Sequence, residues 1–174
     1  QCYRTGRVEH IKNVLANTNY YLGFKLVRGA YMEKERERAQ KMNYTSPIHV
    51  SKADTDNEYN QALKLCVENI QRISICAGTH NEESSQYLVD LMEEHNIAAF
   101  HPHIFFAQLL GMSDHISFNL AKAGYNVAKY VPYGPVKAVL PYLSRRASEN
   151  SSVKGQVGRE LGLISQELKR RSMA

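Results

Sequence analysis

The stretch YLGFKLVRGA, residues 21–30, joins a short apolar run to a glycine-containing exit. The run from Tyr21 to Val27 is typical of a buried strand, and Arg28-Gly29 ends it. Three further apolar runs have the same form: ISICAG at 73–78, HIFFAQ at 103–108 and NVAKYV at 126–131. Strands that are apolar along their whole length are typical of a parallel sheet.

Helical patterns separate these four strands. We expect helices at about residues 5–17, 32–42, 55–70, 82–94, 114–124, 136–150 and 156–171, with a loop at 43–54. Strands that alternate with helices predict an α/β protein built from βαβ units. Four strands fit either a small doubly wound sheet or half of an eight-stranded (β/α)8 barrel, whose whole needs about 250 residues. Spacing alone does not choose between the two.

The composition is that of an ordinary globular domain, and 174 residues favour one domain over 1–174. The net charge of +5 is spread along the chain, and the basic residues of EKERERAQK (33–41) alternate with glutamates. This pattern indicates a solvated helix face and not a nucleic-acid surface. No apolar run approaches the roughly 18 residues of a membrane span.

The three cysteines, Cys2, Cys66 and Cys76, have no metal-ligand spacing, so we expect buried or idle thiols in a reducing compartment. His101 and His103 stand near the start of a strand without a carboxylate, so we expect no metal site there. The chain starts with a polar segment that lacks an initiator methionine, so we expect it to be part of a longer protein.

Polar and aromatic residues gather where the strands end, which is the functional side of both candidate architectures. They are Lys25, Arg28, Gly29, Ala30 and Tyr31, then Thr79, His80 and Asn81, then Gln108, Leu109 and Gly111, then Lys129, Tyr130 and Tyr133. Each alone has a structural explanation, such as a salt bridge, a helix cap, a turn or packing. Their presence at all four strand ends favours a site.

The segment LPYLSRRASEN, residues 140–150, is typical of a helix with Leu140, Leu143 and Ala147 on its apolar side. Arg145 and Arg146 stand side by side, and Glu149 follows Arg145 by four residues. Arginines are commonly surface residues, but such a pair is also suited to gripping an anion.

Four segments, FKLVRGAYMEKERERAQ, AGTHNEES, QLLGMSDHISFNLAKAGYNVAKYVPYGPV and PYLSRRASENSS, together resemble the proline dehydrogenase (proline oxidase) family. The resemblance is strong from about residue 20 to 152. It implies a (β/α)8 barrel of which this chain supplies strands five to eight and the final active-site helix, as the C-terminal part of one barrel domain. It also implies bound FAD, oxidation of L-proline to Δ1-pyrroline-5-carboxylate and a quinone electron acceptor.

The resemblance assigns roles to individual residues. Arg145 and Arg146 match the pair that grips the proline carboxylate, with Glu149 orienting them. Tyr130 and Tyr142 match tyrosines that pack on the proline ring, Leu109 forms an apolar wall, and Tyr31 closes the pocket. A tyrosine at 130 favours proline over hydroxyproline.

On the flavin side, the resemblance places Arg28, Gly29 and Ala30 beside the cofactor and Thr79, His80 and Asn81 in a second contacting turn. Lys25 stands where many bacterial members have an arginine close to flavin N5. Lys25, Tyr130, Arg145 and Arg146 are therefore the expected catalytic group. The lysine, aspartate and glutamine that complete the family's site belong to earlier strands.

Three interpretations follow. The first is a catalytic part of a flavin-dependent proline dehydrogenase, cytoplasmic or peripheral on the inner membrane, on the matrix side in a mitochondrion. The second is a catalytically incomplete half-barrel module that binds itself, a partner or a missing N-terminal half, because half a barrel leaves two free strand edges and an uncovered face. The third is another barrel enzyme that acts on carboxylate substrates.

Overall fold

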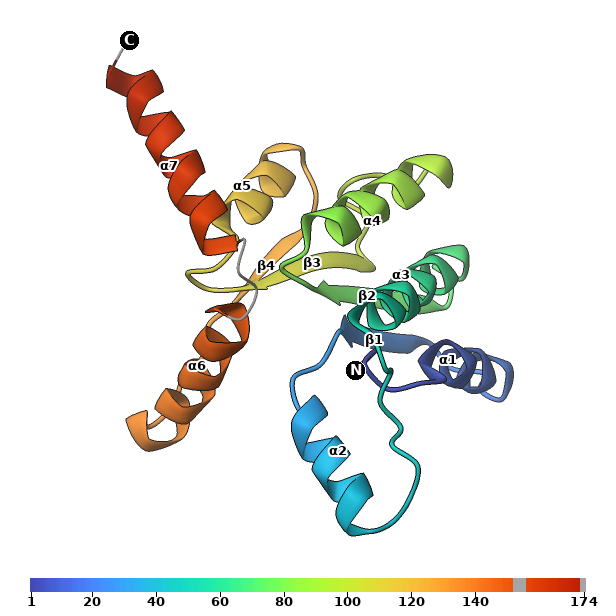
Figure 1. The fold of residues 1–174 in the computed structure, drawn as a ribbon. Coiled ribbons are helices and arrows are strands. Elements are labelled where there is room, and N and C mark those ends of the chain that lie inside the picture. Colours follow the sequence, from blue (N-terminus) through green and yellow to red (C-terminus); the bar gives the residue numbers. More distant parts are fainter. Residues whose placement is uncertain (152–155, 173–174) are drawn as a thin grey trace. The chain divides into compact units, whose positions relative to one another are not determined.

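Four parallel strands, adjacent in the order in which they occur along the chain, form the sheet (Figure 1). The structure is a computed structural model that describes the backbone of residues 1–151 and 156–172, and the side chains of 1–146 and 161–172. The strands are β1 (Leu22–Val27), β2 (Ile73–Gly78), β3 (Ile104–Leu109) and β4 (Val127–Tyr130). All four lie within one or two residues of the predicted runs.

The helices follow the strands in alternation, as predicted. They are α1 (Arg7–Ala16), α2 (Met32–Lys41), α3 (Lys52–Glu68), α4 (Glu82–Glu94), α5 (Asp114–Lys122), α6 (Val136–Ser151) and α7 (Gln156–Ser172). The chain divides into two compact units, Gln1–Tyr130 and Val131–Ala174, which we call the first and second units. The sheet and its covering helices belong to the first unit, and α6 and α7 form the second.

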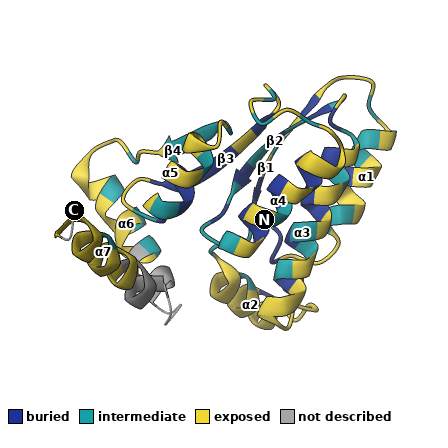
Figure 2. Ribbon diagram, turned by 90° about the horizontal axis from the view of Figure 1, so that it is seen from above, coloured by how far each residue is buried: buried dark blue, intermediate teal, exposed yellow. Residues whose placement is uncertain are grey.

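The two faces of the sheet have different surroundings. Helices α3 and α5 pack directly on one face, and α1 and α4 pack against α3 (Figure 2). The buried core lies between, with Leu26, Ile75 and Phe106 from the strands and Tyr59 and Leu88 from the helices. We call this side the helix-covered face, and the opposite side the open face.

Strand alternation and the parallel register assign each residue to a face. The open face carries Gly23, Lys25 and Val27 of β1, Ser74, Cys76 and Gly78 of β2, Phe105, Ala107 and Leu109 of β3, and Ala128 and Tyr130 of β4. Both faces are largely apolar, as expected for a parallel sheet that other layers cover.

Helix α3 begins three residues earlier than the pattern predicts. Ser51 accepts a hydrogen bond from the backbone N–H of Asp54 at 3.0 Å, and the Asp54 carboxylate accepts one from the Ser51 N–H at 3.2 Å. This reciprocal arrangement is a capping box. The predicted loop therefore ends at Ser51 and not at Asp54, and the Ser-x-x-Asp spacing was the signal that the sequence offered.

The N-terminal residues occupy part of an edge that we expected to be free. The backbone N–H groups of Cys2 and Tyr3 donate to the carbonyls of Val27 and Arg28, each at 2.8 Å. The outer edge of β1 is thus paired at its carboxyl end, which corrects the expectation of two free edges. β4 pairs with β3 on one side.

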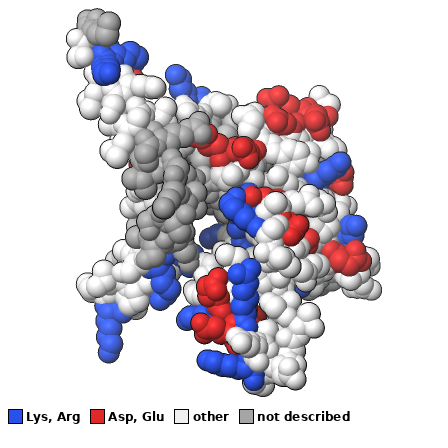
Figure 3. Space-filling model, in the orientation of Figure 1, with Lys and Arg blue, Asp and Glu red and all other residues white. Residues whose placement is uncertain are grey.

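Helix α2 carries both signs of charge, with Glu33 and Glu35 in its first turn and Arg38 and Lys41 in its last. Acidic and basic side chains accordingly intermingle on the molecular surface (Figure 3). This is the solvated helix face that the sequence predicts. Among the described residues, no helix is long and apolar enough to cross a membrane.

Candidate active site

Lys25 and Tyr130 meet on the open face, although they lie on opposite edge strands. The Lys25 Nζ lies 5.0 Å from the centre of the Tyr130 ring. Three strand spacings of about 4.8 Å each separate β1 from β4, so the same side chains on a flat sheet would stand well apart. The sheet therefore curves around this face, as a segment of a barrel wall does.

A row of small side chains crosses the open face between these two residues. Val27, Gly78, Ala107 and Ala128 are partners in the register from β1 to β4. A Cβ atom at Gly78 would lie 2.8 Å from Val27 Cγ1 and 3.5 Å from Lys25 Cε. Close packing therefore requires glycine at position 78. The four small side chains of the row leave a shallow surface beside Lys25.

Leu109 ends β3 and pairs in register with Tyr130. It is buried, and its carbonyl accepts a hydrogen bond from the Met112 N–H at 3.1 Å. The structure therefore brings together three predicted site residues on the open face: Lys25, Leu109 and Tyr130.

Arg28 lies on the other side of the strand from Lys25 and is bound within the chain. Its Nε donates to the Asp56 carboxylate of α3, and its two terminal nitrogens donate to the Thr79 and Ser84 hydroxyls at 2.8 Å each. Its guanidinium carbon lies 4.6 Å from the centre of the buried Tyr59 ring. Arg28 thus ties the end of β1 to α3, α4 and the end of β2.

Asp56 is the carboxylate at the centre of this cluster. Burial would raise its pKa, but hydrogen bonds from Lys52 and Arg28 outweigh burial and lower the pKa below its ordinary value. The Arg28 guanidinium uses three of its five N–H donors on the chain itself, which leaves two.

Gly29 is needed for packing against the chain's own N-terminus. Its φ of 104° lies in the left-handed region, and a Cβ there would lie 1.8 Å from Cδ1 of the Tyr3 ring. Ala30 follows without a described role of its own. Tyr31 is the N-cap residue of α2, with the Lys34 Nζ 5.8 Å from its ring centre.

The turn after β2 also has structural functions. The Thr79 hydroxyl accepts from Arg28 and from the Asn81 N–H at 3.1 Å, and the Asn81 side chain caps α4 by accepting from the Ser84 N–H at 2.7 Å. His80 Nδ1 lies 3.0 Å from the Ser113 hydroxyl. These residues hold together the N-terminal ends of α4 and α5.

The sequence names Gln108 only as a strand-end residue, without its contacts, and it gives no role to Ser117, His115 or Glu82. Gln108 is buried on the helix-covered face, where its amide donates to the Thr79 carbonyl at 3.3 Å and accepts from Ser117 at 2.9 Å. His115 and Glu82 form a 2.6 Å pair between α5 and α4. Helix starts rich in Ser, Asp and His were the available signal.

Lys129 also belongs to the helix-covered side. Its Nζ donates to the Met112 carbonyl at 2.9 Å and to the Asp114 carboxylate at 2.7 Å. It therefore fixes the start of α5 and does not join Lys25 and Tyr130.

In the second unit, Tyr142, Arg145 and Arg146 lie on α6. The Arg146 guanidinium carbon is 5.1 Å from the Tyr142 ring centre, as expected for residues four positions apart on a helix. Arg145 is exposed and Arg146 is half-buried. Glu149 lies within α6, but its side chain is outside the described residues. The arginine clamp remains a prediction.

Within the described part of the chain, no group of three or more His, Cys, Asp or Glu side chains is placed to hold a metal ion. His101 and His103 have rings 5.5 Å apart, and His103 Nδ1 lies 2.8 Å from the Ser74 hydroxyl. The three cysteines are free thiols.

A curved parallel sheet whose strands are adjacent in chain order, with helices packed on one face, is typical of the (β/α)-barrel class. Residues 1–159 match the family model described as proline dehydrogenase. The chain belongs to the proline dehydrogenase family.

Relatives and solved structures agree. The chain is 40% identical over 177 residues to proline dehydrogenase 1, mitochondrial, of Homo sapiens, covering 98% of this chain and 30% of that protein. It is 45% identical over 153 residues to hydroxyproline dehydrogenase of Xenopus laevis, covering 86% and 33%. It therefore spans about a third of the length of these relatives.

Among solved structures, proline utilization A (PutA) of Bdellovibrio bacteriovorus superposes with a TM-score of 0.78 at 27% identity. The match covers 86% of this chain and 16% of that one. A mutant PutA of Bradyrhizobium japonicum matches with a TM-score of 0.74 at 28% identity. The four parallel strands thus correspond to part of a barrel domain, which decides between the two architectures that the sequence left open.

Proposed function

We propose that this chain supplies part of the active site of an FAD-dependent enzyme that oxidises L-proline to Δ1-pyrroline-5-carboxylate and passes the electrons to a quinone. The observation that carries the proposal is the meeting of Lys25 and Tyr130 on the concave face, at 5.0 Å, in a chain of the proline dehydrogenase family. In barrels of this kind, active sites lie at the carboxyl ends of the strands.

The residues of the open face fit a planar cofactor. The row of Val27, Gly78, Ala107 and Ala128 offers a shallow apolar surface, and a cation stands next to it at Lys25. When bound, FAD supplies the acceptor for a hydride from the substrate. Lys25 would stabilise negative charge on the flavin ring as a point charge, without the two-pronged geometry of an arginine.

The resemblance assigns cofactor contacts to two turns, Arg28–Ala30 and Thr79–Asn81. The contacts within the chain restrict which groups of these turns can still bind a cofactor. Arg28 keeps two N–H donors after its contacts within the chain, and α4 presents its N-terminus beside Asn81, where an anion is favoured. We propose that this turn holds the cofactor's phosphates with these remaining donors. Gly29 instead serves the packing of Tyr3.

Arg145 and Arg146 are proposed to bind the substrate carboxylate, since guanidinium binds a carboxylate through two parallel hydrogen bonds. Tyr130, Tyr142, Leu109 and Tyr31 would then enclose the ring. Replacing Arg146 with lysine keeps the charge and removes the fork. We expect the KM for proline to rise at least about tenfold, with a smaller change in kcat. An unchanged KM would contradict the clamp.

The preferred ring is the second question, because one relative is a hydroxyproline dehydrogenase. We propose proline, because the Tyr130 side chain leaves little room for a further hydroxyl. The Tyr130→Ser variant should shift the ratio of kcat/KM values toward hydroxyproline. Tyr133→Ser, a nearly fully exposed tyrosine three residues on, is the matched control. Equal ratios in wild type and Tyr130→Ser would show that Tyr130 does not touch the ring.

The decisive experiment is an FAD titration of the purified protein, followed by anaerobic addition of proline. We expect the visible flavin absorbance of a bound cofactor and its bleaching by proline. Lys25→Met should impair the bleaching, whereas Lys41→Met, on the exposed side of α2, should not. A protein that takes up no FAD would overturn the proposal.

That negative result would favour a second candidate, a half-barrel module that associates with itself, with a partner or with a missing N-terminal half. The observation in its favour is the open face, where Phe105 and Tyr130 are 41% and 48% exposed. Large aromatic side chains left open on a sheet are typical of a surface that another element covers.

A further inference from the structure

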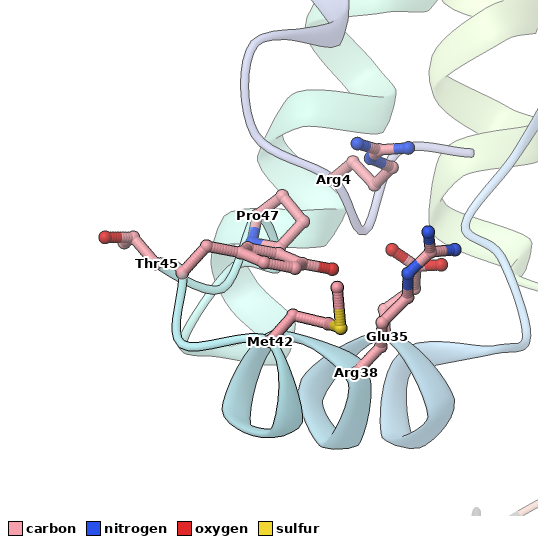
Figure 4. Close-up of a pocket in the computed structure, with 7 residues that line it drawn as sticks. Arg4, Glu35, Arg38, Met42, Thr45 and Pro47 are labelled. Carbon is pink, nitrogen blue, oxygen red and sulfur yellow. The ribbon is translucent and has the colours of Figure 1, made fainter.

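A pocket on the first unit contains none of the candidate active-site residues. It is a hollow of about 480 Å³ between the N-terminal segment, helix α2 and the loop that follows α2 (Figure 4). Its lining residues are Arg4, Glu35, Arg38, Met42, Tyr44, Thr45 and Pro47. Its volume lies within the range of small-molecule sites.

The backbone fixes the shape of this pocket. Helix α2 ends with Asn43 in the left-handed conformation at φ 54°. The N–H of Tyr44 donates to the Ala39 carbonyl at 3.0 Å, and that of Asn43 to the Gln40 carbonyl at 3.3 Å. This pair of bonds is a Schellman motif, which sets the direction of the chain at Tyr44.

The opposite wall is also held by backbone bonds. The N–H of Thr5 donates to the Pro47 carbonyl at 2.9 Å, and that of His49 donates to the Tyr3 carbonyl at 2.8 Å. Arg4 forms an antiparallel bridge with Ile48. The N-terminal segment and the loop are thus joined, and the pocket exists without a ligand to order it.

Three charged side chains line the pocket. Arg4, Arg38 and Glu35 are among the side chains that line it (Figure 4), and among the described residues none of the three has a side-chain hydrogen bond or ion pair. Neighbouring Arg36 differs, because it reaches Glu33 at 3.4 Å and the His49 carbonyl at 3.2 Å. The pocket therefore presents two cations and one anion together with the apolar surfaces of Met42, Tyr44 and Pro47.

We propose that this pocket binds a zwitterionic α-amino acid with an apolar side chain. Arg4 and Arg38 take its carboxylate, and Glu35 takes its ammonium group. Met42 and Tyr44 contact the side chain. A simple carboxylic acid satisfies the arginines but meets the repulsion of Glu35, and a simple amine meets two arginines. Only a ligand with both charges matches all three groups.

The test compares three molecules that carry the same isobutyl group on the α-carbon: L-leucine, isocaproate, which lacks the amine, and isoamylamine, which lacks the carboxyl group. Binding is followed by amide shifts in two-dimensional NMR spectra of the protein. We expect leucine to bind about threefold to fivefold more tightly than either analogue, because exposed charge pairs contribute modestly. Equal affinities for leucine and isocaproate would overturn the proposal.

The variant Glu35→Gln gives a reciprocal check, because it should weaken leucine and strengthen isocaproate. Arg38→Gln should weaken both, whereas Lys41→Gln removes the same charge from the same helix outside the pocket and should change neither. Unchanged leucine binding in Arg38→Gln, or its loss in Arg146→Gln instead, would place the ligand elsewhere and refute this site. Because leucine is not the proposed substrate and no flavin is needed, this outcome is independent of the proposed enzyme activity.

Discussion

The two faces of the sheet are built from the same strands but perform different tasks. The helix-covered face is closed by the chain itself, and its strand-end residues Arg28, Gln108 and Lys129 all have partners in the first unit. On the open face, Lys25 and Tyr130 contact each other across the curve of the sheet. The open face is therefore the face that the helices of the first unit do not cover.

This difference teaches that a polar strand end is not by itself a site. The direction of the side chain determines which face of the sheet a strand-end residue lies on, and this direction alternates along a strand. Arg28 and Lys25 are three positions apart and both basic, yet Arg28 binds residues of α3 and α4 whereas Lys25 lies on the open face. Because neighbouring residues of one strand lie on opposite faces, substituting each member of such a pair compares the two faces directly.

The largest expected effect separates two adjacent phenylalanines of β3. Phe106, fully buried on the helix-covered face, should cost about 3–5 kcal/mol when changed to alanine, through lost burial and a cavity. Phe105, 41% exposed on the open face, should cost about 1 kcal/mol or less. Urea unfolding measures both. Phe106→Leu, a smaller deletion, keeps the comparison measurable if the alanine variant does not fold. Similar losses at both positions would mean that the open face is covered.

The second pair is Arg28 and Lys25. Arg28→Ala removes three side-chain hydrogen bonds and leaves Asp56 without its inner partner, so we expect a loss of about 2–4 kcal/mol. Lys25→Ala should change the free energy of unfolding by less than about 1 kcal/mol. The loss of stability in Arg28→Lys should fall between these two values, because a lysine ammonium keeps the positive charge but lacks the planar guanidinium that reaches all three acceptors. A larger loss at Lys25 than at Arg28 would reverse the assignment of the two faces.

The third prediction concerns pH and the same cluster. The folded-state pKa of Asp56 is below the unfolded value, so its contribution to stability is present above about pH 4 and disappears as the pH falls through the folded pKa. Asp56→Asn should lower stability at neutral pH by about 1 kcal/mol and flatten the dependence below pH 4. Asp90→Asn, on the exposed side of α4, is the control. A wild-type acid dependence that persists in Asp56→Asn would assign it to other carboxyls.

The strands and most helices were predictable because each strand is a short apolar run bounded by turn residues, and each helix has a regular apolar side. The start of α3 was not, because the polar segment around Ser51 and Asp54 favours a loop although the spacing of these two residues forms a cap. The pairing of Cys2 and Tyr3 with the end of β1 was also missed, because hydrogen bonds between backbones leave no trace in residue type.

The candidate site was predictable in part. The resemblance named Lys25, Leu109 and Tyr130, and the structure places all three on the open face. A salt bridge and a helix cap were among the structural explanations that the sequence offered for these strand ends. The partners of Arg28 and Gly29 were beyond the sequence, because Asp56 and Tyr3 are distant from them in the chain. A sequence motif shows which residue types occur at which spacing, but only the folded structure shows which of these residues contact one another.

The last prediction uses Cys76 as a reporter of the open face. Burial raises the pKa of the Cys66 thiol to about 12 and also raises that of Cys2, so both should react with thiol reagents only after unfolding. Cys76 lies on the open face and is half-buried; burial raises its pKa, but the Lys25 ammonium acts in the opposite direction. One thiol is therefore expected to react in the native protein, more slowly than a free cysteine because its pKa is raised, and Cys76→Ser should remove this reaction.

If copies of the chain associate through the open face, the reaction of Cys76 should slow as the protein concentration rises. Gel filtration over the same concentrations should show a matching increase in size. Association with no change in Cys76 reactivity would mean that another surface joins the copies and that the open face stays accessible. In that case the concave side would be available to a flavin and its substrate even in the associated protein, because Cys76 and Lys25 are neighbours in the register of β1 and β2.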